Sequence, residues 1–300
     1  MQKKWRSQLD IQSMVWPGLI FLFVFSYIPM YGIVIAFQDY DLFAGVLDSP
    51  WVGLKHFQEF FNDPNFGQVI QNTLAINVLG LLIGFPAPIL FALLLNEIAS
   101  MRFKRFIQTV SYLPHFVSWV VFGGLIINVL SPANGIINAI LVQTGVLAEP
   151  VNFMGNADYF WYILVLGEML KGLGWGAIIY IAAIAGVDPE MYEAATIDGA
   201  NRFQKIWHIT LPSIMGTIVI MLIFAISALL NTGFEQILVL QNPLNLETSE
   251  TIDTYVYKLG LRNMRYSYST AVGLTKSVIA LFLLLSANYV SKKISGKGLF

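Results

Sequence analysis

Residues 188–212 read DPEMYEAATIDGANRFQKIWHITLP and form a polar island between two long apolar segments. The opening Asp-Pro predicts a helix start, because an aspartate side chain caps the free N–H groups of a first turn and proline is tolerated at the first helical position. Gly199 supplies a stop, and Asn201 followed three residues later by Gln204 resembles a capping box that opens a second helix. We therefore expect two short helices joined at a glycine.

The composition places the chain in a membrane. Of its 300 residues, 56% are hydrophobic and 12% are charged, against about 25% charged in an average soluble domain. The net charge of −1 favours neither nucleic acid nor an acidic partner. The absence of cysteine excludes disulfides, thiolate metal sites and a cysteine nucleophile. No metal site is predicted, because His56, His115 and His208 form no ligand-spaced pair.

Six segments are long and apolar enough to cross a bilayer, which takes about 20 residues. They cover approximately residues 14–37, 73–95, 106–130, 160–186, 213–230 and 270–290. Pro86 and Pro88 are predicted to kink the second segment, and the fourth is rich in small residues that let helix backbones approach closely. The predicted fold class is an all-α membrane protein with six transmembrane helices.

The distribution of Lys and Arg predicts the orientation, because these residues are enriched in cytoplasmic loops. Eleven of them fall on the side that holds both chain ends and residues 188–212, four fall on the other side, and Lys171 and Lys276 lie inside spans. The eleven are Lys3, Lys4, Arg6, Arg102, Lys104, Arg105, Arg202, Lys205, Lys292, Lys293 and Lys297. Both termini and residues 188–212 are therefore expected in the cytoplasm.

No motif for catalysis or nucleotide binding is found. Residues 273–277 match only the last positions of the phosphate-binding pattern G-x-x-x-x-G-K-[ST], and they lie inside the sixth predicted span. The metalloprotease pattern H-E-x-x-H and the nucleophile pattern G-x-S-x-G are both missing. The chain is therefore not expected to be an enzyme, and any energy that it uses must come from another chain.

Residues 188–212 resemble the EAA motif of ATP-binding-cassette (ABC) importer permeases, the inner-membrane components of binding-protein-dependent transport. That pattern is E-A-A, three residues, G, nine residues and I-x-L-P. Its fixed positions are occupied here by Glu193, Ala194, Ala195, Gly199, Ile209, Leu211 and Pro212. The Asp-Gly-Ala form at 198–200 looks like the carbohydrate-uptake branch. The resemblance implies the type I, MetI-like fold, with a five-helix core at 70–291 that includes a cytoplasmic loop at 187–212.

The same resemblance implies that this loop is a coupling helix docked in a separate ATPase subunit. Two adjacent alanines give a helix surface with small side chains, which can fit closely into a groove of the partner. The acidic side chains beside them can pair with basic groups of that partner. The residues expected to dock are Met191, Tyr192, Glu193, Ala194, Ala195, Asp198, Gly199, Ile209, Leu211 and Pro212. ATP and Mg would be held by the partner ATPase, with no cofactor on this chain. The competing interpretation is an ordinary helical hairpin whose alanines reflect helix propensity.

Polar residues inside spans are expensive and indicate pathway or packing roles. For a sugar, aromatic faces would stack on the rings while amides and carboxylates bind hydroxyls. The candidate pathway residues are Glu168, Trp175, Tyr180, Asn231, Glu235, Gln236 and Lys276. Two alternatives stay open: the aromatic residues can serve packing, and Glu168 and Lys171, three apart on one helix face, can neutralise each other.

The sequence thus predicts a multi-pass permease of the bacterial inner (cytoplasmic) membrane that imports a sugar, most readily an oligosaccharide. Its expected partners are a second homologous permease in a heterodimer, two ATPase subunits and an extracellular solute-binding protein. Residues 1–13 and 292–300 are expected to be cytoplasmic tails, and 14–37 the first transmembrane helix. The alternatives are a permease of the same fold for peptides, phosphate or osmolytes and, more distantly, a secondary transporter.

Overall fold

The computed structural model describes residues 9–295, and over this range every regular element is a helix apart from one isolated bridge between Gln38 and Trp51. The all-helical fold class is therefore confirmed. Lys3, Lys4, Arg6 and Lys297, with most of the two predicted tails, lie outside the described residues.

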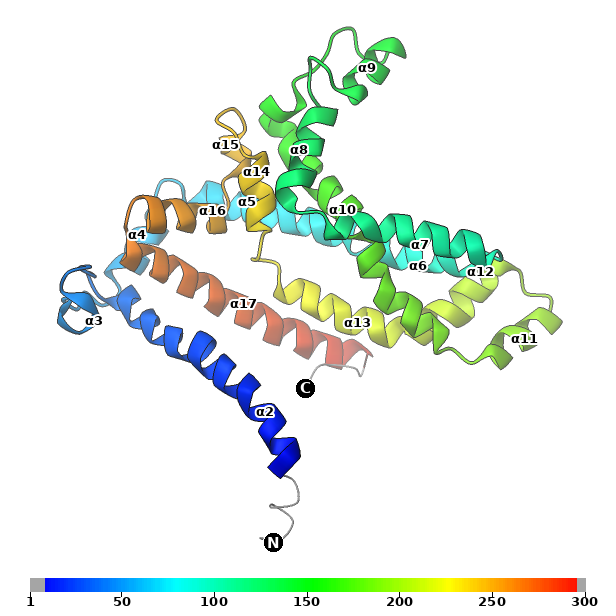
Figure 1. The fold of residues 1–300 in the computed structure, drawn as a ribbon, viewed down its shortest axis with the longest axis horizontal. Helices are drawn as coiled ribbons and strands as arrows, with labels where there is room; N and C mark the ends of the chain where they lie inside the picture. Colours follow the sequence, from blue (N-terminus) through cyan, green and yellow to red (C-terminus); the bar gives the residue numbers. More distant parts are fainter. Residues whose placement is uncertain (1–8, 296–300) are drawn as a thin grey trace. The chain divides into compact units, whose positions relative to one another are not determined.

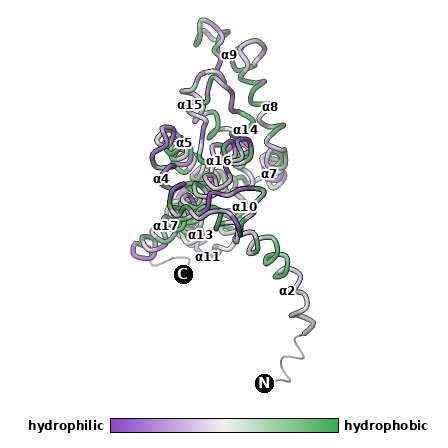
Figure 2. Tube along the Cα trace, turned by 90° about the vertical axis from the view of Figure 1, so that its left-hand side faces the viewer, coloured by the Kyte–Doolittle hydropathy of each residue, from purple (hydrophilic) through white to green (hydrophobic). Residues whose placement is uncertain are grey.

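Five helices among the described residues are long and apolar enough to cross a membrane. They are Ser13–Phe37, Phe66–Asn96, Ala157–Ala185, Arg202–Ser227 and Tyr266–Val290. These helices cover five of the six predicted spans. Figure 2 colours most of the first of them, which begins within α2 and ends at Phe37, as hydrophobic.

The predicted third span, 106–130, differs from the other five because it is broken. The helix axis bends by 103° between Met101–Phe116 (α7) and Trp119–Val129 (α8). Val117 and Ser118 between them are extended, and the Ser118 side chain accepts a hydrogen bond from the N–H of Val121, which caps the new helix. Counted as one span, this pair brings the total to six.

The described residues divide into two compact units. The first comprises 9–66 and 256–277. Its elements are α2 (Leu9–Leu22), η1 (Phe23–Tyr27), η2 (Ile28–Phe37), α3 (Gly45–Asp48), α4 (Lys55–Phe61), η7 (Lys258–Arg262) and the start of α17 (Tyr266–Ser295). The buried rings of Phe60 and Tyr268 pack edge to face at its centre, with centroids 6.3 Å apart, and the Tyr268 hydroxyl donates to Asp63.

The second unit comprises 67–255 and 278–295 and carries every predicted site residue except Lys276. Its elements are α5 (Phe66–Leu79), η3 (Gly80–Gly84), α6 (Pro86–Asn96), α7, α8, α9 (Ile136–Gln143), η4 (Phe153–Gly155), η5 (Ala157–Tyr159), α10 (Phe160–Ala185), α11 (Pro189–Ile197), α12 (Arg202–Lys205), η6 (Ile206–Thr210), α13 (Leu211–Ser227), α14 (Phe234–Leu240), α15 (Leu246–Ser249), most of α16 (Ile252–Tyr257) and the end of α17. Within it α10 packs against α6, α7 and α13 (Figure 1). The core between α6, α10 and α13 consists of Ile89, Ala92, Leu93, Ala177, Tyr180, Ile184 and Ile214.

The prolines of the second span are accommodated without a break between α5 and α6. The π-helical turn η3 precedes Pro86, and the N–H of Phe85 donates to the carbonyl of Gly80. Pro86 then stands in the first turn of α6, where its missing N–H costs least. Phe66–Asn96 consequently remains one membrane-length helix.

The small residues of α10 allow close helix packing, as predicted, and Gly174 is the tightest of these positions. A Cβ atom there would collide with the backbone carbonyl of Ser111 on α7, whereas a Cβ at Gly124 on α8 meets nothing within 4 Å. We expect Gly174→Ala to lower stability by about 1–3 kcal/mol, because backbone cannot move aside as a side chain can. Gly124→Ala, the matched control, should raise stability by about 0.5–1 kcal/mol through helix propensity.

Thermal unfolding of the two purified variants in the same detergent measures this contrast. A Gly174→Ala protein as stable as the parent would show that α7 and α10 are farther apart than described.

Candidate functional site

The helix at the start of residues 188–212 begins and ends as the sequence predicts. Asp188 Oδ1 accepts a hydrogen bond from the N–H of Glu190 at 3.0 Å and caps α11. Gly199 has φ +79°, and its N–H donates to the carbonyl of Thr196 at 3.1 Å, which closes the helix with a left-handed residue. A glycine is favoured here because L-amino acids, which carry a Cβ atom, rarely adopt this conformation.

The predicted capping box is present, but the helix that follows it is not a separate short one. Gln204 N–H donates to Asn201 Oδ1 at 2.9 Å, and Asn201 N–H donates to Gln204 Oε1 at 2.8 Å. From there α12 continues through the π-helical turn η6 into α13 as one helix, Arg202–Ser227. Pro212 stands in the first turn of α13, directly after η6, so the helix passes it without a break. The part of the loop from Arg202 onward therefore belongs to a membrane-length helix.

The predicted docking residues fall into two groups by exposure. Met191, Glu193, Ala194, Asp198, Gly199 and Pro212 are exposed, whereas Tyr192, Ala195 and Leu211 are half-buried and Ile209 is buried. The Tyr192 hydroxyl lies 2.9 Å from Thr210 Oγ1, so this tyrosine holds α11 against the start of the span. Ile209 and Leu211 pack inside the chain and can support the loop but offer little surface to a partner.

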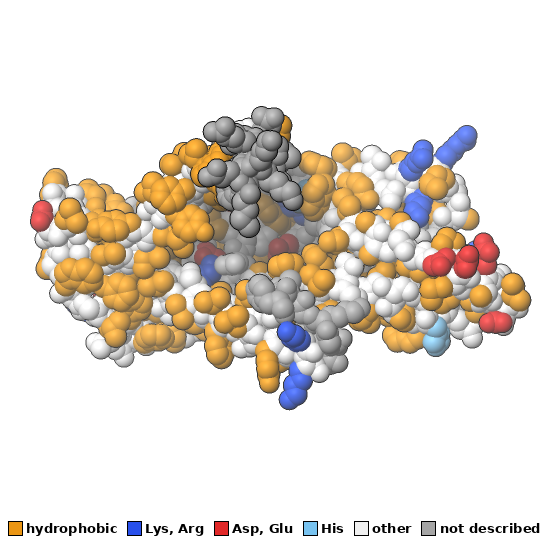
Figure 3. All heavy atoms as spheres, turned by 90° about the horizontal axis from the view of Figure 1, so that it is seen from below, with side chains coloured by type: hydrophobic (Ala, Val, Ile, Leu, Met, Phe, Trp, Pro, Cys, Tyr) orange, Lys and Arg blue, Asp and Glu red, His pale blue; other side chains and the backbone are white. Residues whose placement is uncertain are grey.

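Two apolar side chains of the loop that were not among the predicted docking residues are highly exposed. Ile197 is 87% exposed and Phe203 is 84% exposed. Both residues could have been identified from the sequence, because each is an isolated apolar residue in a polar stretch. Ile197 directly precedes Asp198-Gly199, and Phe203 follows the cap at Asn201. Charged side chains also gather over α11 and α12 (Figure 3). A notch of about 330 Å³ lies between these helices, lined in part by Asp198, Lys205 and His208.

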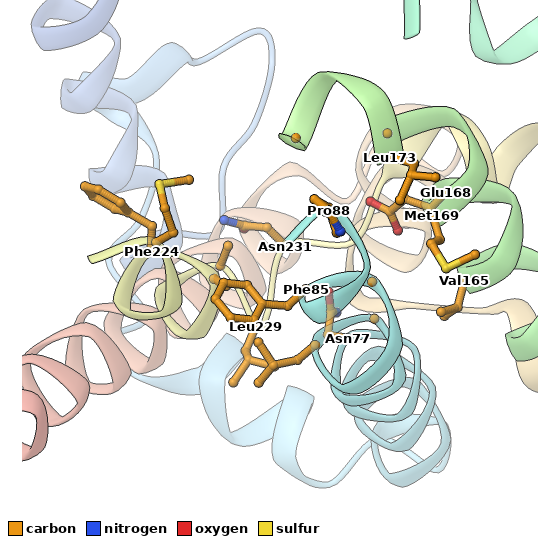
Figure 4. A pocket seen from close by; sticks show the side chains of 18 of the residues that line it. Asn77, Phe85, Pro88, Val165, Glu168, Met169, Leu173, Phe224, Leu229 and Asn231 are labelled. Carbon is orange, nitrogen blue, oxygen red and sulfur yellow. The ribbon is translucent and has the colours of Figure 1, made fainter. Parts of the chain in front are cut away.

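A cavity of about 420 Å³ lies between α5, α6, α10 and α13 within the second unit. Its polar lining includes Asn77, Glu168 and Asn231, and its aromatic lining includes Phe85 and Phe224 (Figure 4). Aromatic faces next to amide and carboxylate groups suit a ligand that has both C–H-rich faces and hydroxyls.

The cavity gathers three of the seven predicted pathway residues: Glu168, Tyr180 and Asn231. Gln236 lies behind it, where its buried amide donates to Glu168 Oε2 at 3.3 Å. Glu235 and Trp175 do not line the cavity, and Lys276 belongs to α17 in the other unit. The predicted pathway residues did not include Phe85 and Phe224, because only the packing of α5, α6, α10 and α13 around one space identifies which face of each helix lines it.

Trp175 and Lys171 instead form a cluster at the break between α7 and α8. The Trp175 ring stacks on His115 with centroids 4.5 Å apart and planes 2° from parallel. Lys171 is 8% exposed, and its Nζ donates to the His115 carbonyl at 2.8 Å and lies 5.4 Å from the Trp119 ring centroid. Glu168 and Lys171 therefore take different partners rather than each other.

No group of three or more histidine or acidic side chains suited to a metal ion occurs among residues 9–295.

Comparison with known proteins identifies the family. Residues 64–296 match the family described as the binding-protein-dependent transport system inner membrane component. The chain is 47% identical to the polygalacturonan/rhamnogalacturonan transport system permease protein YteP of Bacillus subtilis, over 98% of this chain and 91% of that protein. It is 45% identical to Protein LplB of the same organism, over 95% of this chain and 89% of that protein.

A solved structure is similar over the full length. It is the bacterial alginate ABC transporter in complex with an alginate pentasaccharide-bound periplasmic protein, with a TM-score of 0.90 and 37% identity over 100% of this chain and 99% of that chain. This chain therefore belongs to the binding-protein-dependent transport system inner membrane components, a family of multi-pass transport subunits rather than enzymes.

Proposed function

We propose that this chain is the permease subunit of an ABC importer that carries an oligosaccharide across the bacterial inner membrane. The observation that carries the proposal is 47% identity, over 98% of the chain, to a permease named for polygalacturonan and rhamnogalacturonan transport. The cavity supports it, because the aromatic side chains of Phe85 and Phe224 line it together with the amides of Asn77 and Asn231.

In this proposal α11 is the coupling helix and docks in a separate ATPase subunit that binds ATP and Mg. Met191, Glu193, Ala194 and the turn at Asp198–Gly199 would form the contact surface, with Ile197 and Phe203 as additional apolar anchors. Tyr192, Ala195, Ile209, Leu211 and Pro212 would hold the loop on the span rather than meet the partner. Support comes from the helix Arg202–Ser227, which begins in the loop and continues as a membrane-length helix.

The assembly would contain a second, homologous permease, two ATPase subunits and an extracellular binding protein. Its organisation would follow the boundaries expected from sequence: cytoplasmic tails at 1–13 and 292–300, a first transmembrane helix at 14–37, and a core at 70–291 whose loop at 187–212 faces the cytoplasm. The placement of Lys and Arg supports this orientation. Glu168, Tyr180 and Asn231 would line the path, with Gln236 behind them.

The test is uptake by the complete importer reconstituted in lipid vesicles, with ATP enclosed on the side of the ATPase subunits. We expect oligosaccharides, presented with the binding protein, to accumulate and to stimulate ATP hydrolysis. A panel of peptides, phosphate and osmolytes serves as the comparison. Stimulation by one of those solutes and by no oligosaccharide would contradict the proposal.

Charge reversal on α11 tests the coupling surface separately. Glu193 is exposed, so Glu193→Lys should leave the fold intact while placing a cation where the partner is expected to offer one. We expect ATP-driven uptake to fall at least about tenfold, because like-charge juxtaposition in an interface costs several kcal/mol. Glu193→Gln should be milder. Unchanged uptake and ATPase activity in Glu193→Lys vesicles would remove Glu193 from the docking surface.

A further inference from the structure

The charge of the membrane cavity is set by one side chain. Among its described lining residues, Glu168 is the only Asp, Glu, Lys, Arg or His. The other polar side chains there are the amides of Asn77 and Asn231 and the hydroxyl of Tyr180. This wall therefore offers hydrogen-bonding groups for hydroxyls but no cation to pair with an anion.

Glu168 is held so that it faces the cavity. It lies on α10, and Gln236, which is 1% exposed, reaches it from α14 with an N–H donated to Oε2 at 3.3 Å. The residue as a whole stays exposed, and Figure 4 shows its carboxylate among the lining side chains. The buried Gln236 amide holds Oε2 in place and leaves Oε1 of Glu168 available to a bound ligand.

The cation nearest to Glu168 in sequence does not neutralise it. Lys171 is buried, donates to the His115 carbonyl and lies over Trp119, so its ammonium is committed to the break between α7 and α8. It is not among the residues that line the cavity.

We propose that the cavity selects electrically neutral oligosaccharides over uronate-containing ones, with Glu168 as the residue that determines this specificity. The inference rests on the proposed function and narrows its substrate class. A uronate carboxylate against this wall would meet the Glu168 carboxyl group, apolar side chains and only uncharged donors, with no cation from this chain to offset its desolvation. A neutral sugar would instead place hydroxyls on Glu168, Asn77 and Asn231. The chain would then differ in substrate charge from its relatives named for polygalacturonan and for the acidic polysaccharide alginate.

The experiment compares paired substrates that differ only in charge. Oligogalacturonides and the same oligomers after reduction of each carboxyl to a hydroxymethyl group form one pair, and glucuronoxylo-oligosaccharides before and after the same reduction form a second. Uptake of each is measured in vesicles that contain the complete importer with wild-type, Glu168→Gln or Glu168→Lys permease. The binding protein is identical throughout, so its own preference cancels when acidic-to-neutral ratios are compared between variants.

We expect Glu168→Lys to raise the acidic-to-neutral uptake ratio about tenfold or more above the wild-type ratio, with Glu168→Gln between them. Glu97→Gln, at the end of α6 and outside the cavity, is the matched control and should leave the ratio unchanged. An acidic-to-neutral ratio that is the same in wild-type and Glu168→Lys vesicles overturns the charge selectivity and leaves oligosaccharide import standing. If no oligosaccharide of either series is taken up or stimulates ATP hydrolysis, the proposed function itself fails.

Discussion

Replacing Gly199 by proline should lower ATP-driven uptake in the assembled importer by about a hundredfold while the permease remains folded. Gly199 has φ +79°, which proline cannot adopt, and its N–H donates to the Thr196 carbonyl, a bond that proline removes. The combined cost is about 3 kcal/mol or more. Since a factor of ten corresponds to about 1.4 kcal/mol, coupling through the loop should fall by about a hundredfold.

The control is Gly199→Asn at the same position. Asparagine tolerates the left-handed conformation, and a Cβ at Gly199 would meet nothing within 4 Å, so side-chain bulk alone should be harmless. We expect this variant to keep most of its uptake. Gel filtration and thermal unfolding establish that both variants are folded before uptake and ATP hydrolysis are measured. Wild-type transport by Gly199→Pro would show that the turn does not transmit force.

The local structure of this loop could be predicted from sequence because short-range rules determine it. The cap at Asp188, the left-handed Gly199 and the reciprocal bonds between Asn201 and Gln204 each involve groups within a few residues of one another. The continuation of α12 into α13 was missed, because a π-helical turn before Pro212 leaves no composition signal.

The cavity was harder to predict, since its lining depends on contacts between helices far apart in the chain. Asn77 on α5 and Asn231, which follows α13, are both polar residues at or near the membrane, yet only the packing of these helices with α10 places them around the same space. Trp175 was a reasonable candidate by residue type, but its ring stacks on His115 at the broken span. The break between α7 and α8 was missed because a span is recognised from the length and mean hydropathy of an apolar segment. The two extended residues Val117 and Ser118 change neither the length nor the mean hydropathy noticeably.

Replacing Lys171 by methionine should loosen the bend between α7 and α8. The ammonium donates to the carbonyl of His115, near the end of α7, where a helix leaves its last carbonyls without partners. Water is scarce at membrane depth, so loss of this donor would leave the carbonyl unpaired, at a cost of about 1–3 kcal/mol. Loss of the cation over Trp119 adds about 0.5–2 kcal/mol.

Spin labels report the bend directly, because the chain has no native cysteine to interfere. Labels at Phe106→Cys and Leu125→Cys, both exposed positions on the two sides of the break, should give one narrow distance distribution in the parent. In the Lys171→Met background we expect a broader distribution extending toward the roughly 28 Å of a straight helix. Lys171→Arg, which keeps the charge and the donors, should remain close to the parent, and an unchanged Lys171→Met distribution would show that the bend needs no lysine.

The same variant distinguishes a positioning role from a direct role in the path. Lys171 and Glu168 share α10, but Lys171 faces the break while Glu168 lines the cavity. If Lys171 acts only through the bend, Lys171→Met should lower uptake of acidic and neutral oligosaccharides by the same factor, because it alters how α7 and α8 are held rather than the charge that a substrate meets. A change in the acidic-to-neutral ratio would instead mean that the ammonium reaches the substrate during transport, and Lys171 would then share with Glu168 the control of substrate charge.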